Sequence, residues 1–136
     1  MIKQLSIKGI KNTCRYIVHI KETSNNTILT LTDLFGNCLL WQSNGSSKFK
    51  GLRKSTSVAN NTTGVLLGGR IKALGIKTVN LHFNGWGKHR KETVKGLLQN
   101  GLFVKSIKEN TALPHNGCRL KKKKRIRRRR FKTYWF

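Results

Sequence analysis

The sequence predicts an α/β domain in which a mixed five-stranded sheet packs against two helices. Two observations carry this prediction. Five short stretches alternate apolar and polar side chains or are rich in β-branched residues, and two longer stretches place apolar side chains at helical spacing. In chain order these stretches read β-β-β-α-β-α-β, an order in which helices connect the later strands of one sheet. The length of 136 residues suits one domain with one modest core.

Three strands come first, and short polar turns join them. Residues 14–21 place a buried-type side chain at every second position, which is the period of a strand. Residues 27–33 are rich in β-branched side chains, and residues 38–42 form the third strand. Strands with such short connections predict an antiparallel meander. We expect Trp41, in the third strand, to lie in the core.

Two helices and two further strands complete the order. The first helix begins after Ser55 or Ser57, either of which is a suitable cap, and ends near Leu74, before Gly75. Its Asn, Thr and Gly content is unfavourable for a helix, so tertiary packing must hold it. We expect its glycines to permit close approach to the sheet. The remaining elements are a strand at 77–83, a helix from about 88 to 100 closed by Gly101, and a strand at 102–108.

The charge of the chain restricts its partners. The sequence holds 29 basic and only four acidic residues, which gives a net charge of +25. Eleven of the basic residues lie in 119–136, a segment without carboxylates, and subtracting eleven from +25 leaves +14 on the rest. Such a chain repels itself when compact, so we infer an anionic partner. Nucleic acid is the first candidate. An anionic membrane surface, with residues 134–136 as an aromatic anchor, is the second, and no apolar stretch is long enough to span a bilayer.

Motifs for catalysis are weak. Two-metal phosphodiester cleavage needs several converging carboxylates. The four acids come from separate elements, and only Asp33 is an inward-pointing candidate for a nuclease, which is the catalytic alternative. The pair Gly85-x-Gly87 lacks the third glycine of a dinucleotide fingerprint, where Arg90 stands. We therefore expect that this chain is not an enzyme and binds no cofactor.

The spacing of the cysteines and histidines along the sequence does not match that of a metal site. The three cysteines are widely spaced and form no CxxC pair, which argues against a disulfide framework and fits a reducing compartment. His115 and Cys118 lie three residues apart, but no second pair has the spacing of a zinc site. We expect no metal.

Two basic, glycine-containing loops each lead from a strand to the start of a helix, at 43–54 and 84–91. Helix N-termini present unpaired N–H groups and a partial positive charge, and glycine lets a phosphate approach the backbone. We expect these loops to contact phosphate, with simple solvated turns as the alternative. Trp86 in the second loop is a candidate platform for an unpaired base. The basic tail is expected to become ordered only on RNA.

A distinctive run precedes the basic tail: TALPHNGCR at 111–119, followed by KKKKR at 121–125. Upstream, in order, come SNNTI at 24–28, FKGLRKST at 49–56 and GIK at 75–77. Together these motifs resemble the universal small-subunit ribosomal protein eleven family over about residues 15–125.

The resemblance implies a ribonuclease-H-like core without catalysis and a structural role on the platform of the small ribosomal subunit, near the messenger exit path. The implied partners are small-subunit ribosomal RNA and neighbouring platform proteins, with messenger RNA nearby. Neither a membrane nor a small-molecule substrate is implied. The second loop departs from the family, which usually has proline at what are here Trp86 and Lys88. Heavy use of Lys, Asn and Ile favours an organelle-encoded, mitochondrial member, with a plastid or the bacterial cytoplasm as alternatives.

The predicted organisation is an N-terminal extension at 1–13, a single α/β core domain at 14–112 and a basic RNA-binding tail at 113–136. The alternative function is a non-ribosomal RNA chaperone or single-strand RNA-binding protein. The expected contacts with ribosomal RNA fall in the first loop, the second loop and the tail. They are Lys48, Lys50, Arg53, Lys54, Ser55, Trp86, Lys88, Arg90, His115, Asn116, Gly117, Arg119, Lys121, Lys122, Lys123, Lys124, Arg125, Arg127 and Arg128.

Overall fold

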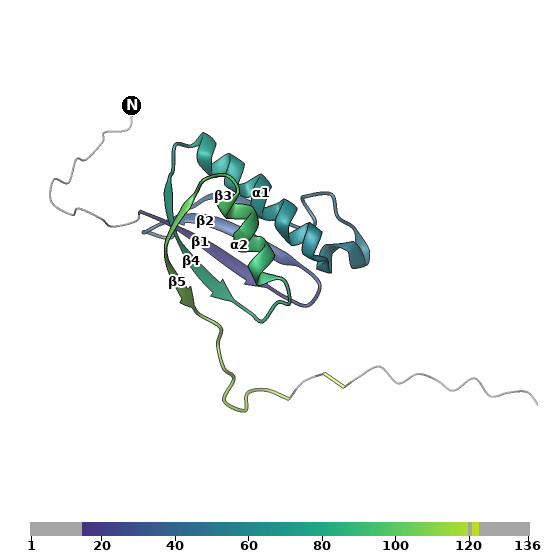
Figure 1. The fold of residues 1–136 in the computed structure, drawn as a ribbon. Coiled ribbons are helices and arrows are strands. Elements are labelled where there is room, and N and C mark those ends of the chain that lie inside the picture. The colour runs from purple at the N-terminus through teal and green to yellow at the C-terminus, as the bar shows by residue number, and fades with distance from the viewer. Residues whose placement is uncertain (1–14, 120, 123–136) are drawn as a thin grey trace, which may run out of the picture.

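The structure is a computed structural model that describes residues 15–119 and 121–122 (Figure 1). The described elements follow the predicted order, with one short 3-10 helix, η1, that the sequence did not predict. They are β1 (Tyr16–Glu22), β2 (Thr27–Asp33), β3 (Cys38–Ser43), η1 (Gly51–Ser55), α1 (Ser57–Ala73), β4 (Thr78–Asn84), α2 (Arg90–Leu98) and β5 (Phe103–Glu109). The β-β-β-α-β-α-β prediction is therefore confirmed.

The sheet is mixed, as predicted, with strand order β3-β2-β1-β4-β5. Strands β1, β2 and β3 pair antiparallel, whereas β4 runs parallel to β1 and β5 parallel to β4. Tight turns can join only antiparallel neighbours, and a parallel pair needs a crossover. Helices α1 and α2 supply those crossovers. Strands β1 and β4 consequently end at the same edge of the sheet.

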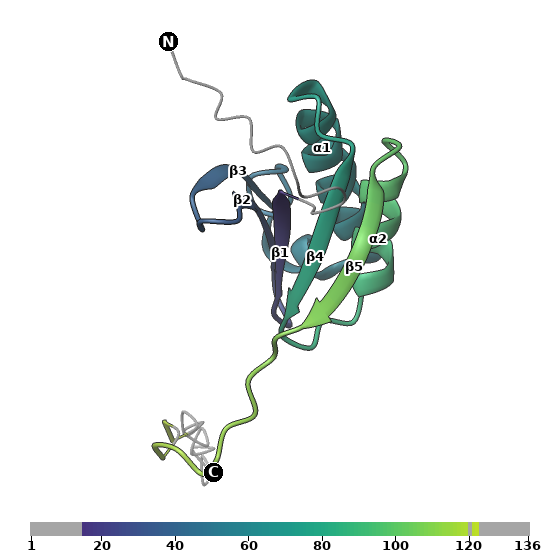
Figure 2. The ribbon, with the colours of Figure 1, turned by 90° about the vertical axis from the view of Figure 1, so that its left-hand side faces the viewer.

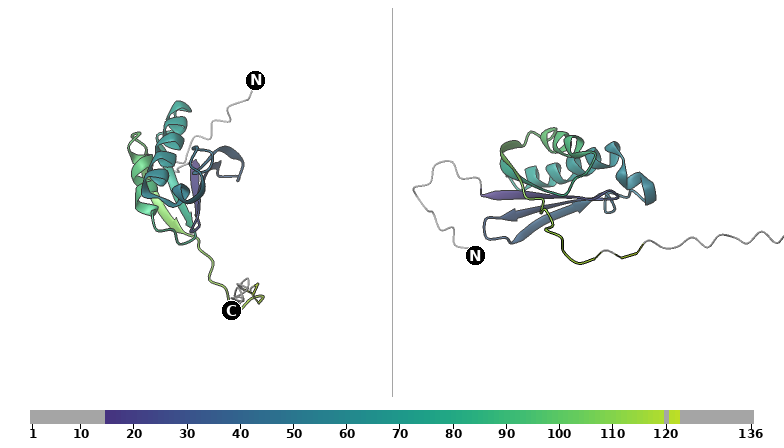
Figure 3. Two further views of the ribbon diagram at one scale, coloured as in Figure 1. Left: turned by 90° about the vertical axis from the view of Figure 1, so that its right-hand side faces the viewer. Right: turned by 90° about the horizontal axis from the view of Figure 1, so that it is seen from below.

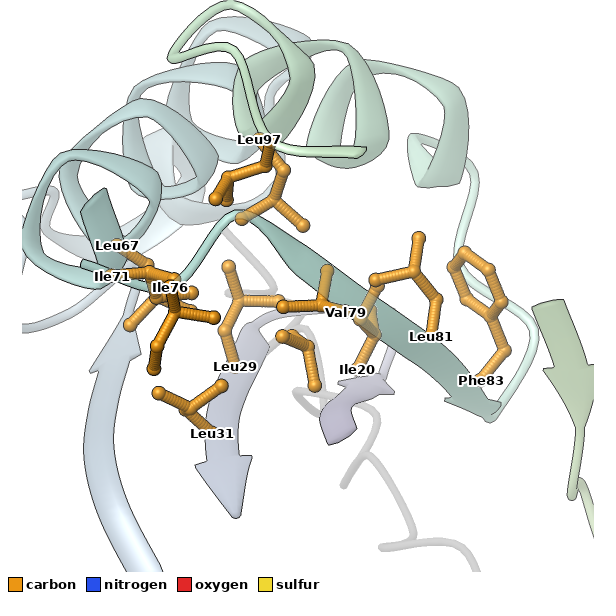
Figure 4. Packing of buried hydrophobic residues seen from close by; sticks show 12 residues of the cluster. Ile20, Leu29, Leu31, Leu67, Ile71, Ile76, Val79, Leu81, Phe83 and Leu97 are labelled. Carbon is orange, nitrogen blue, oxygen red and sulfur yellow. The ribbon is translucent and has the colours of Figure 1, made fainter. Parts of the chain in front are cut away.

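Both helices cover the same face of the sheet, as the view along the sheet shows (Figure 3, right). The hydrophobic core forms between the helices and the sheet, and the strands contribute side chains at alternate positions (Figure 4). Fully burying one Val, Leu or Ile side chain contributes roughly 1.5–3 kcal/mol to the stability of the fold. The core side chains are Val18, Ile20, Leu29, Leu31, Leu67, Ile71, Ile76, Val79, Leu81, Phe83, Leu97 and Leu102.

Gly64 and Gly68 of α1 face α2, so the expectation that the helix glycines approach the sheet is wrong. A Cβ added at Gly64 would lie 2.5 Å from the carbonyl oxygen of Thr93. A Cβ at Gly96 in α2 would clash in turn with the carbonyl oxygen of Asn61. Glycine at these positions therefore lets the two helix backbones come close together. This packing holds α1 in place although its sequence has a low helix propensity. The N-cap of α1 is Thr56, whose Oγ1 accepts from the amide of Ala59, 3.3 Å away, rather than either predicted serine.

Trp41 is 57% exposed, so its predicted place in the core is wrong. Its register partner is Thr30, on the sheet face that the helices do not cover. Its neighbours Leu40 and Gln42 pair with the core residues of β2 and take the covered face instead. Because side chains alternate along a strand, that assignment leaves Trp41 outside.

Asp33 also differs from its prediction as an inward-pointing carboxylate. Its Oδ1 accepts hydrogen bonds of 2.9 Å from the amides of Phe35 and Asn37, and its Oδ2 accepts one from the Asn37 side chain. These bonds close the β2–β3 turn and lower the pKa of Asp33, chiefly through the Asn37 side chain. The carboxylate has a structural role in this turn.

Candidate nucleic-acid interface

The two basic loops, which the sequence treats as separate, meet at one end of the sheet. Strands β1 and β4 both end there, and both α1 and α2 begin there (Figure 1). One groove, called here the loop groove, is lined by the β1–β2 turn, the end of η1 and the loop after β4. Its lining residues are Thr23, Ser24, Asn26, Thr27, Lys54, Ser55, Asn60, Trp86, Gly87, Lys88 and His89.

The first loop is anchored by Asn44, a residue that sequence reasoning missed. Its side chain is fully buried, and its Nδ2 donates to the carbonyl of Lys54 at 2.6 Å and to Asn60 Oδ1 at 2.5 Å. The loop is thereby tied to α1. A second hollow lies within this loop, lined by Ser47, Lys48, Phe49, Lys50 and Arg53. Three of the predicted cations (Lys48, Lys50 and Arg53) are exposed, while Lys54 and Ser55 are half-buried.

The second loop is held by Arg90, which links three elements. Its Nη1 lies 2.7 Å from Glu109 Oε2 in β5, and its Nε lies 3.7 Å from Glu22 Oε2 at the end of β1. Its Nη2 also donates to the carbonyl of Gly85 in the loop. Arg90 therefore ties the loop to both neighbouring strands, and only 22% of its side chain is exposed.

The same guanidinium lies over two aromatic rings. Its Cζ is 5.2 Å from the ring centre of Phe83 and 5.0 Å from that of Trp86. Stacking of this kind is a favourable cation–π contact. It positions Trp86, which is 76% exposed and lines the loop groove.

Glu22 lies beneath this loop and is 3% exposed. Burial raises the pKa of Glu22, while Arg90 and the hydroxyl of Thr93 act in the opposite direction. A Cβ at Gly85 would clash with the carbonyl oxygen of Glu22, and a Cβ at Gly87 would clash with its carboxylate. These glycines thus let the loop close over a buried carboxylate, a reason for glycine that their sequence spacing does not reveal.

The segment after β5 is attached to the loop at Thr111. Its Oγ1 accepts a 2.8 Å hydrogen bond from the amide of Gly85 and donates to Glu109. The Thr111 hydroxyl, followed by Arg90, lowers the pKa of Glu109. Beyond Thr111 the chain leaves the domain (Figure 2).

The structure therefore does not bring the predicted tail residues to the loop groove. The predicted residues described in this segment are all exposed, and Asn116 has a φ of 54°. They are His115, Asn116, Gly117, Arg119, Lys121 and Lys122. Lys123, Lys124, Arg125, Arg127 and Arg128 lie outside the described residues, as does the predicted extension 1–13.

The sequence model described as Ribosomal protein S11 matches residues 16–125. The chain belongs to this family. It is 42% identical to the small ribosomal subunit protein uS11 of Carsonella ruddii, over 82% of this chain and 95% of that protein. It is 42% identical to uS11 of Ruthia magnifica (81% and 87%) and 39% identical to uS11 of Leptothrix cholodnii (91% and 92%).

Family membership confirms the resemblance inferred from the spaced motifs. The chain is a structural, non-enzymatic ribosomal protein of the S11 family. The relatives named above are bacterial, so they do not support the expectation of a mitochondrial protein.

The lining of the loop groove is basic. Two helix N-termini, exposed Lys88 and half-buried Lys54 face one space, and the carboxylate beneath it, Glu22, is buried beside Arg90. In residues 15–119 and 121–122, no group of three or more His, Cys, Asp or Glu residues could hold a metal ion. Among the described helices, none is long and apolar enough to cross a membrane.

Proposed function

We propose that this chain is a structural constituent of the small ribosomal subunit and binds small-subunit ribosomal RNA through the loop groove and the basic tail. The observation that carries the proposal is the meeting of two basic loops and two helix N-termini in one groove. Phosphate binds readily where free N–H groups and the helix dipole point at it. The family membership supports the same ligand.

Each loop has its own role in this proposal. Lys48, Lys50, Arg53, Lys54 and Ser55 receive phosphates, and Lys88 receives one from the opposite side of the groove. Trp86 stacks on an unpaired base, which is a common mode of RNA recognition. Arg90 acts mainly by holding Trp86 and the loop in place, since its charge is already paired with two carboxylates.

The tail extends the contact. Residues 113–136 follow the single core domain proposed for 14–112, and they place His115, Asn116, Gly117, Arg119 and the basic residues up to Arg128 along RNA. The charge of this segment would be neutralised by phosphates, so ordering and binding occur together.

The proposed location is the subunit platform near the messenger exit path, beside other platform proteins. The Lys-, Asn- and Ile-rich composition supports an organelle, the mitochondrion, whereas the bacterial relatives support the bacterial cytoplasm. Fractionation of the source cells decides between them: recovery with organellar ribosomes supports the first, and recovery with bacterial ribosomes contradicts it.

Charge-neutral variants of the first loop test the groove. We expect replacement of Lys48, Lys50, Arg53 and Lys54 by Gln to weaken binding to small-subunit ribosomal RNA by at least tenfold at about 0.15 M salt, because phosphate contacts dominate affinity. The matched control replaces four exposed lysines elsewhere, Lys72, Lys77, Lys95 and Lys105, by Gln. Equal losses in the two variants would contradict a localised site and indicate only a general charge effect.

A further inference from the structure

The face of the sheet that the helices leave uncovered carries a row of side chains across all five strands. In register, Trp41 of β3 is opposite Thr30 of β2, Thr30 is opposite His19 of β1, His19 is opposite His82 of β4, and His82 is opposite Lys108 of β5. The core residues alternate with these positions along their strands, so the row faces away from both helices. Both helices lie on the other side of the sheet in the view along it (Figure 3, right).

The two histidine rings of this row contact each other, and Trp41 and His19 are accessible. His19 and His82 meet edge to face with ring centres 5.3 Å apart, and His19 Nε2 lies 3.1 Å from Thr32 Oγ1. Arg70 of α1 binds the carbonyl of Trp41 at 3.2 Å, which holds β3 while the indole stays 57% exposed. His19 is also exposed, and His82 is half-buried.

The charge of this face is positive. Lys21 and Lys108 are exposed on it, Lys21 opposite Ile28 at the end of β1. The four carboxylates of the chain all lie elsewhere. Glu22 is buried under the loop groove, Asp33 closes the β2–β3 turn, Glu92 lies on α2, and Glu109 pairs with Arg90.

Exposed rings beside lysines, without carboxylates, match one class of ligand. Single-stranded RNA is bound by aromatic side chains that stack on its bases, among them Trp and His, and by cations that contact its phosphates. A partner protein suited to this face would need an acidic surface, and a basic partner would be repelled.

We propose that the uncovered face of the sheet is a second RNA-binding surface, on which unpaired bases stack against Trp41 and His19 while Lys21 and Lys108 contact phosphates. This surface is separate from the loop groove, to which none of these four residues contributes lining. The inference rests on the proposed function, because it takes its RNA to be small-subunit ribosomal RNA.

The test measures binding of the full-length chain to purified small-subunit ribosomal RNA. We expect Trp41→Ser to weaken binding roughly 5- to 100-fold, as loss of a base–aromatic stack does. Trp41→Phe should restore most of the affinity, because a ring is kept. The control is Leu66→Ser, which removes an apolar side chain of similar exposure (44%) from α1, and it should leave binding within about twofold. A thermal unfolding midpoint of Trp41→Ser close to that of the unchanged chain would verify that the variant folds.

The outcomes separate this inference from the proposed function. If Trp41→Ser binds as the unchanged chain does while the four-lysine loop variant is weakened, the second surface is wrong and the loop groove stands. If Trp41→Ser binds RNA normally but fails to enter assembled subunits, a protein covers this face and the RNA proposal is overturned. If the unchanged chain does not bind this RNA, both proposals fail.

Discussion

Arg90 is the residue on which the geometry of the second loop depends. It bonds to the loop carbonyl of Gly85, pairs with Glu109 and lies 3.7 Å from the buried Glu22. The sequence does not reveal this cluster, because Glu22, Arg90 and Glu109 lie far apart along the chain and meet only through the parallel pairing of β1, β4 and β5. Sequence reasoning placed Arg90 against RNA and did not find its intramolecular partners.

Replacing Arg90 should therefore destabilise the fold. We expect Arg90→Met to lower the free energy of unfolding by about 1–3 kcal/mol, since it leaves a buried carboxylate without its positive neighbour. Urea denaturation at pH 7 measures this change. The control is Lys91→Met, one position along the same helix at an exposed site, which should change stability by less than about 0.5 kcal/mol. Equal effects of the two substitutions would show that the cluster contributes nothing.

The pKa of His82 should lie below that of an ordinary histidine. Burial first, then the neighbouring His19 and Lys108, hold its pKa below the ordinary 6.5. The folded state therefore binds the His82 proton less tightly than the unfolded state does. Its contribution to stability is present above pH 6.5 and is lost as the pH falls through the folded-state pKa.

Nuclear magnetic resonance titration of the histidine ring protons between pH 5 and 8 measures this pKa directly. We expect a value below 6.5 in the unchanged chain and a higher value in His19→Gln, because that substitution removes a nearby positive charge. The variant His82→Gln should lose less stability than the unchanged chain when the pH is lowered from 7 to 5. A His82 pKa at or above 6.5 would contradict the account.

At the scale of elements, the order of strands and helices was predictable from the sequence. Which side chains of an edge strand face the core was not. Val79, Leu81 and Phe83 alternate cleanly, and the structure buries all three. In β3 the residues Leu39, Leu40 and Trp41 are all apolar, so alternation cannot say which of them faces inward. Only the register with β2 places Trp41 outside.

The contact between α1 and α2 gives an element-scale prediction with a matched control. We expect Gly96→Ala to destabilise the fold by about 1–3 kcal/mol or more, because the new methyl group meets the backbone of Asn61. Gly69→Ala places its methyl group 3.7 Å from Asn100 Oδ1, an ordinary contact, and should stabilise the helix by about 0.5–1 kcal/mol. Thermal unfolding compares the two. A Gly96→Ala variant as stable as the unchanged chain would show that the helices do not need this close approach.

At the scale of the whole molecule, charge and topology act together. The sequence revealed two basic loops and a basic tail, but their relation depends on which strands are parallel. Because β1 and β4 end at one edge, the loops share a groove, and the tail starts from the same edge after β5 (Figures 1 and 2). Part of the net charge of +25 is thereby gathered on one surface, and such a surface suits a polyanionic ligand.

The salt dependence of RNA binding should report the contribution of the tail. If about eight tail charges meet phosphates, the logarithm of affinity should fall with the logarithm of salt concentration with a slope near −6, at roughly −0.7 per contact. Deleting residues 119–136 removes eleven basic residues and should flatten this slope. Filter binding at several salt concentrations measures it, and an unchanged slope would contradict a role for the tail.

The most direct test of the ribosomal role is sedimentation of a lysate from the native source, following this chain across a density gradient with and without ribonuclease. We expect the chain to migrate with the small ribosomal subunit and to leave that position when the RNA is digested. Migration with light or mixed RNAs, independent of the subunit, would contradict it and would indicate a non-ribosomal RNA-binding protein.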